Sequence, residues 1–206
     1  MSFDTFFGVI VLIMSVVIHE VSHGMAALYL GDETAKLEGR LTLNPLKHLD
    51  PFGSVILPIL LVVTHAGFVF GWAKPVPYNP YNLRNQKWGD AIVAAAGPVS
   101  NLILACVFGI LVRVGIGYSL FSSTLVSIFA SVVFINIVLA IFNLVPIPPL
   151  DGSKILFSFL PYYMRNVRIA LERYGFFLVI LFAFFLWNFI SPIIDVVFRL
   201  ITGISF

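Results

Sequence analysis

Apolar residues fill four stretches of the chain, each long enough to cross a lipid bilayer as a helix. The hydrocarbon layer is about 30 Å thick, and a helix needs about 20 apolar residues to cross it. The four stretches comprise residues 6–30, 91–115, 121–145 and 174–190. This pattern predicts an all-α integral membrane protein, a polytopic helix bundle with about four to six membrane segments.

A fifth apolar stretch, residues 52–71, is of marginal length. It is interrupted by Gly53, Pro58, His65 and Gly67. Such a stretch either crosses the bilayer or enters it and returns to the same side, packed against protein.

The last stretch, residues 192–206, follows the fourth apolar segment and begins with a proline. It either lies along the membrane interface or extends the last span. Asp195 and Arg199 have the i,i+4 spacing at which side chains pair on a helix, so we expect an ion pair there.

Hydrophobic and polar residues alternate over residues 35–43, AKLEGRLTL. A period of two is typical of a β-strand, and Gly39 near the middle suits a turn. We therefore expect a small β-hairpin near residues 35–43.

Composition agrees with a membrane protein. Hydrophobic residues make up 60% of the 206 residues and charged residues 11%, whereas soluble domains have about 25% charged residues. The mean hydropathy is +1.02. We expect a single membrane-embedded domain over residues 1–206, with a core at 6–160 and C-terminal helices at 161–206. The basic residues lie in short loops and form no tract, so we expect no nucleic-acid partner.

The first span contains the sequence VVIHEVSHGM, residues 16–25. On a helix, His19 and His23 share a face one turn apart, and Glu20 stands beside them. This is the H-E-x-x-H arrangement of zinc hydrolases. Hydrogen bonding between helices is an alternative role for the two histidines. However, each ionisable group inside a membrane costs about 2.5 to 3.5 kcal/mol, so three of them within five residues favour a metal or a cavity.

Hydrolytic zinc sites usually have three protein ligands and one open position, so a third ligand must lie elsewhere. Ala26 and Tyr29 stand where the longer soluble pattern has a glycine and a histidine. The remaining candidates are Asp50, Asp90, His48, His65 and Asp151. The first three lie in polar loops, and His65 suits a gate, a proton relay or an alternative ligand. Asp151 is the strongest candidate, because it follows a segment whose prolines break an apolar helix beside protein or water.

Three motifs together resemble the site-2 proteases, zinc metalloproteases that cut substrates within the membrane. They are HEVSH at 19–23, AGPVSN at 96–101 and NLVPIPPLDG at 143–152. The resemblance implies His19, His23 and Asp151 as ligands of one zinc ion and Glu20 as the catalytic acid/base. It also implies that Asn143 lies near the reacting carbonyl. For Gly97, Pro98 and Asn101 we expect close helix packing rather than chemistry.

The resemblance is to short, compact members of the family, because the chain has no room for a PDZ or nucleotide-sensing domain. It implies a zinc-dependent endopeptidase that hydrolyses peptide bonds in or near transmembrane segments of membrane proteins. A substrate helix must unwind locally before attack. The segment with Leu37, Arg40 and Leu41 either pairs with the extended substrate or only covers the site. The alternative function is a non-catalytic protein that binds zinc or transports it, although a transporter should carry more ionisable groups along its spans.

The shared zinc ion constrains topology, because His23 and Asp151 must lie on the same side of the membrane. The spans at 91–115 and 121–145 already make an even number of crossings between them, so residues 52–71 should be re-entrant. One side then carries Lys36, Arg40, Lys47, Lys74, Arg84, Lys87, Lys154, Arg165, Arg168 and Arg173. The positive-inside rule assigns that side to the cytoplasm. We expect an outside N-terminus and an active site toward the cytoplasm, in the cell membrane of a prokaryote. The sequence makes no prediction of oligomeric state.

Overall fold

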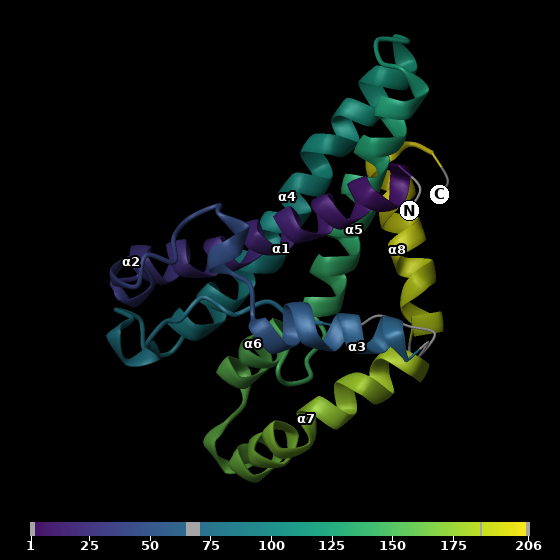
Figure 1. Cartoon of the computed structure of the whole chain (residues 1–206). Helices are drawn as coiled ribbons and strands as arrows, with labels where there is room; N and C mark the ends of the chain where they lie inside the picture. Colours follow the sequence, from purple (N-terminus) through teal and green to yellow (C-terminus); the bar gives the residue numbers. More distant parts are fainter. Residues whose placement is uncertain (1–2, 65–70, 186, 205–206) are drawn as a thin grey trace.

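The computed structural model describes residues 3–64, 71–185 and 187–204, and helices dominate them (Figure 1). The α-helices are α1 (Phe3–Tyr29), α2 (Thr34–Leu37), α3 (Leu57–Val63), α4 (Gly89–Gly117), α5 (Ser123–Asn143), α6 (Asp151–Phe159), α7 (Arg165–Phe185) and α8 (Trp187–Thr202). Short helical turns are η1 (Pro45–Lys47), η2 (Pro51–Ile56), η3 (Pro80–Asn82) and η4 (Tyr162–Met164). No β-strand occurs among these residues.

Three helices in the described part of the chain are long and apolar enough to cross a membrane: α1, α4 and α5. They coincide with the first three apolar stretches of the sequence, so these expectations are confirmed. The fourth stretch, residues 174–190, is divided between α7 and α8. The first half of α7 carries Arg165, Arg168, Glu172 and Arg173. A fourth crossing therefore stays a prediction.

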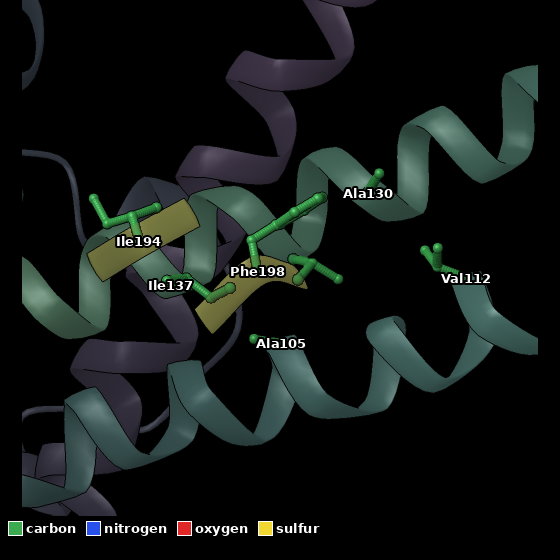
Figure 2. Close-up of a cluster of buried hydrophobic side chains, with 7 residues drawn as sticks. Ala105, Val112, Ala130, Ile137, Ile194 and Phe198 are labelled. Carbon is green, nitrogen blue, oxygen red and sulfur yellow. The ribbon is translucent and has the colours of Figure 1, made fainter. Parts of the chain in front are cut away.

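The apolar core lies where α8 packs against α4 and α5. Its buried side chains are Ala105, Val112, Ala130, Val133, Ile137, Ile194 and Phe198 (Figure 2). A Cβ added to Gly109 of α4 would lie 2.1 Å from the Ile201 side chain of α8, so this glycine lets the two helices approach closely. Small residues at helix contacts favour packing in membranes in this way. Residues 192–202 thus pack on the spanning helices, and Arg199 pairs with Asp195 at 2.8 Å as expected.

The β-hairpin expected near residues 35–43 is wrong. Residues 34–37 form the single helical turn α2, and Gly39 follows it with a φ of +62°. The Arg40 N–H donates to the Ala35 carbonyl, and the Gly39 N–H donates to the Lys36 carbonyl. This is the Schellman arrangement, in which a left-handed glycine closes the C-terminus of a helix. Gly39 therefore ends a helix rather than turning a hairpin.

Residues 51–63 are helical, through η2 and α3. At about 1.5 Å per residue they extend about 20 Å, less than the hydrocarbon thickness. The chain on either side of this segment is joined by hydrogen bonds. The Lys74 N–H donates to the His48 carbonyl at 2.8 Å, and the Trp72 N–H donates to the Gly53 carbonyl at 3.2 Å. The two ends of the 52–71 stretch therefore lie side by side. His65 lies outside the described residues.

Candidate metal centre

Helix α1 presents His19 and His23 on one face, as their spacing predicts. The two rings are edge to face with centroids 4.6 Å apart. Both side chains are buried, with 5% and 8% of their surfaces exposed. The α1 face that carries them packs against α4 and α5.

Asp151 reaches the two histidines from α6, of which it is the first residue. Its Oδ2 lies 3.1 Å from His19 Nε2 and 3.2 Å from His23 Nε2. A Cβ on Gly152 would lie 2.2 Å from the Leu144 carbonyl oxygen, so glycine allows α6 to begin directly against the end of α5. The chain reversal after α5 thus places a carboxylate opposite the histidines of α1.

These three side chains form a group of potential metal ligands in the described part of the chain, with their ligand atoms within 4.8 Å of one another. Neither Asp50 nor Asp90 nor His48 belongs to that group. Burial disfavours the charged form of Asp151, but hydrogen bonds from His19 and His23 outweigh this effect and hold the pKa of the Asp151 carboxyl below its usual value. Asp151 is therefore an anion at neutral pH, as a metal ligand must be.

The outer nitrogens of both imidazoles are hydrogen-bonded to α4. His23 Nδ1 lies 2.7 Å from the Val93 carbonyl oxygen, and His19 Nδ1 lies 2.6 Å from Asn101 Oδ1. Both partners accept, so the Nδ1 atoms donate to them, and the Nε2 atoms face Asp151. Hydrogen bonds of this kind, made by the ring nitrogen that does not face the metal, orient metal-ligating histidines. Two imidazole nitrogens and one carboxylate fit the donor set of a hydrolytic zinc site with one open position.

Asn101 also belongs to a buried polar network that the sequence did not predict. Its Nδ2 donates to Asn136 Oδ1 of α5 at 2.7 Å, and Asn136 Nδ2 donates to the Ser15 hydroxyl of α1 at 2.9 Å. We expected packing for Asn101, but it contacts a candidate ligand directly. The signal was present, because asparagines in two apolar spans call for hydrogen-bond partners across helices.

Gly97 has the expected packing role, and it packs against the histidines of the metal centre. A Cβ at this position would lie 2.5 Å from His23 Nε2 and 2.6 Å from His19 Cε1. The α4 backbone therefore lies directly against both imidazoles. Pro98 is fully buried beside it.

Glu20 lies next to His19 and is half-buried. Its Oε2 accepts a hydrogen bond of 2.9 Å from the Val76 N–H. This amide belongs to the chain between the 52–71 stretch and α4. Asn143 is half-buried at the end of α5, where its Nδ2 donates to the Leu139 carbonyl at 2.9 Å.

The remaining candidate residues serve local structure. Asp50 Oδ1 accepts from the Phe52 and Gly53 N–H groups, and His48 Nε2 pairs with the Thr42 carbonyl. The Tyr78 hydroxyl donates to Asp90. Leu37 at the end of α2 is exposed, and in the loop that follows Leu41 is half-buried, whereas Arg40 is buried.

Comparison with known proteins relates the chain to metalloproteases. Residues 114–186 match peptidase family M50. The chain is 40% identical over 207 residues to "Putative zinc metalloprotease YwhC" of Bacillus subtilis (strain 168), covering 95% of this chain and 91% of the relative. It is 31% identical over 183 residues to "Putative zinc metalloprotease Rip2" of Mycolicibacterium smegmatis, covering 85% of this chain and 68% of the relative. No solved structure matches it significantly.

Proposed function

The chain belongs to peptidase family M50 and is a membrane-embedded zinc metalloprotease, and from this premise we propose that it hydrolyses peptide bonds in or near transmembrane segments of membrane proteins. The observation that carries the proposal is the convergence of His19 Nε2, His23 Nε2 and Asp151 Oδ2 beside Glu20. This group lies on a helix long and apolar enough to cross the bilayer. Both relatives are named as zinc metalloproteases, which supports a protease over a non-catalytic protein that binds or transports zinc.

We assign His19, His23 and Asp151 to one zinc ion per chain and Glu20 to proton transfer. When bound there, zinc polarises the scissile carbonyl and makes water a usable nucleophile near neutral pH. The Glu20 carboxylate accepts a proton from the attacking water and returns it to the leaving nitrogen. We assign the Asn143 amide to stabilising the oxygen of the scissile carbonyl. To do so, Asn143 Nδ2 would give up its hydrogen bond to the Leu139 carbonyl and donate to the substrate instead.

The substrate in this proposal is a membrane protein whose transmembrane helix unwinds locally. Every carbonyl of an intact helix accepts an internal hydrogen bond, so the scissile carbonyl is available only after unwinding. Segments with glycine, proline or polar residues unwind at the lowest cost. We therefore expect such residues near cleavage sites.

We further propose that residues 1–206 act as one membrane-embedded unit in a prokaryotic cell membrane, with the centre toward the cytoplasm. The contacts of α8 with α4 and α5 support a single unit. The hydrogen bonds between His48 and Lys74 and between Gly53 and Trp72 support a re-entrant 52–71 stretch.

The test uses purified protein and its Glu20→Gln variant. In proteoliposomes, the wild type should cleave a labelled single-span peptide with a central Gly-Pro break, detected by mass spectrometry. Glu20→Gln should keep zinc and lose at least about 100-fold in rate, because an amide cannot accept the proton. Substantial proteolysis by this variant would exclude Glu20 as the acid/base.

A further inference from the structure

Residues 72–79, which we call the strap, form neither helix nor strand and connect the end of the 52–71 stretch with the chain that leads to α4. Four of its backbone N–H groups are hydrogen-bonded to other parts of the chain. The pairs are Trp72 to the Gly53 carbonyl, Lys74 to the His48 carbonyl, Val76 to Glu20 Oε2 and Asn79 to Asp32 Oδ2. The strap therefore has a fixed path, and one of its contacts is the catalytic carboxylate.

Val76 lies directly on α1 beside the metal centre. Its side chain is buried, and its Cγ1 lies 2.8 Å from where a Cβ on Gly24 would be. Pro75 and Pro77 flank it, and a residue before proline is confined to extended conformations. The direction of the Val76 N–H is thus set by its neighbours.

Arg40 holds the strap at the residues just before Val76. Its guanidinium Nη2 donates to the Lys74 carbonyl at 2.9 Å and to the Pro75 carbonyl at 3.2 Å. Only 5% of its surface is exposed. A charge so well buried needs partners, and the guanidinium finds them in these two strap carbonyls. The glycine cap after α2 places Arg40 there, through the Arg40 N–H bond to the Ala35 carbonyl.

We propose that Arg40 is a positioning residue that acts through the strap on Glu20. It fixes the Val76 N–H on Glu20 Oε2, which leaves Oε1 to exchange the proton with water and the leaving nitrogen. Fixing the carboxylate matters, because a displacement of about 1 Å in a catalytic group can cost about 100-fold in rate. This inference rests on the proposed role of Glu20 and assigns Arg40 neither to substrate binding nor to gating.

The direct test removes the amide hydrogen. Val76→Pro should lower kcat about 10- to 100-fold in the peptide cleavage assay, with KM and zinc content unchanged. Val76→Ala keeps the N–H and reports the effect of the side chain, so the proline variant should lose about tenfold more kcat than the alanine variant. Ala73→Pro is the matched control, because the Ala73 N–H donates none of these four hydrogen bonds.

Arg40→Met provides the second test, whether or not Val76→Pro folds. It should lower kcat to a similar extent with zinc content unchanged, and Arg40→Lys should recover part of the rate. Hydrogen–deuterium exchange of the strap should accelerate in Arg40→Met, a readout that needs no catalysis. Combining Arg40→Met with Val76→Pro should cost no more than the worse single change, since both act on one contact.

Two results would overturn the inference. One is full or increased kcat in Arg40→Met and Val76→Pro while Glu20→Gln is inactive, which would leave the protease function intact. The other is a loss confined to KM or to zinc content, which would make Arg40 a substrate-binding or structural residue. Absence of cleavage by the wild type would instead refute the proposed function.

Discussion

Asp151 is the anionic member of the proposed zinc site, and its role can be tested by removing the charge alone. Asp151→Asn keeps the size of the side chain but replaces an anionic oxygen with a neutral one. We expect zinc affinity to fall by at least about 100-fold, because carboxylate is the better ligand and losing even a ligand's hydrogen-bond partner typically costs about 10- to 100-fold. Metal analysis of purified protein at limiting zinc measures the change.

Asp50→Asn is the matched control, since Asp50 accepts hydrogen bonds from two backbone N–H groups and an asparagine oxygen can still accept them. Its zinc content should equal that of the wild type. Unchanged zinc content in Asp151→Asn together with lowered zinc content in Asp50→Asn would show that Asp50, rather than Asp151, is the carboxylate ligand.

At the residue scale, the sequence predicted the parts of the site that depend on local geometry. His19 and His23 meet because helical spacing alone places them on one face. Their partners on α4, the Asn101 amide and the Val93 carbonyl, depend on how α4 is rotated and shifted along α1. No local pattern encodes that register, so the sequence could show that Asn101 needs a partner across helices but not that the partner is His19.

At the element scale, residues 35–43 show how a local pattern can mislead. Alternation and a central glycine predicted a hairpin, but a glycine with positive φ suits a helix C-cap as well as a turn. The buried side chain of Ala35, next to Gly24 of α1, favours the helical turn. Tertiary contact decided between two locally acceptable structures, and it placed Arg40 against the strap.

The contact between α1 and α4 leads to a prediction for Gly97. Gly97→Ala would place a methyl group 2.5 Å from His23 Nε2, so the imidazoles or the helices must move. We expect zinc affinity to fall at least about tenfold and the protein to lose about 1 to 3 kcal/mol of stability from overpacking. Competition with a chelating zinc indicator measures the affinity, and thermal unfolding in detergent measures the stability.

Gly117→Ala on the same helix is the control, because a Cβ there meets nothing within 4 Å. It should leave zinc affinity unchanged. Normal zinc affinity in Gly97→Ala would mean that α4 does not lie against the histidines as the structure places it.

On the scale of the whole molecule, apolar length predicted the three main spans, whereas the packing of α8 escaped prediction. The sequence left residues 192–206 either along the interface or as an extension of the last span, whereas Ile194 and Phe198 of α8 are buried against α4 and α5. Hydrophobicity shows that a segment avoids water, but it does not distinguish lipid from protein as the partner. Whether a helix packs against lipid or against protein depends on the shape of its surface, as where Gly109 lets α4 and α8 approach closely.

The side of the membrane on which the centre lies is the last prediction, and it depends on the 52–71 stretch. The hydrogen bond between His48 and Lys74 keeps the two ends of this stretch together. A full crossing would part them by about the 30 Å thickness of the hydrocarbon layer. Cysteines introduced singly at Lys47 and Tyr81, both exposed, in a Cys106→Ala background should therefore share one side. In intact cells both should be shielded from an impermeant thiol reagent, and both should react after permeabilisation.

A cysteine at Leu120, exposed between α4 and α5, is the control for the opposite side and should react in intact cells. Labelling at Tyr81 without labelling at Lys47 in intact cells would mean that the stretch crosses the membrane. His23 and Asp151 would then lie on opposite sides, and the shared zinc site would have to be abandoned. Labelling at both Lys47 and Tyr81, with Leu120 shielded, would keep the re-entrant stretch but place the centre toward the outside, against the charge distribution.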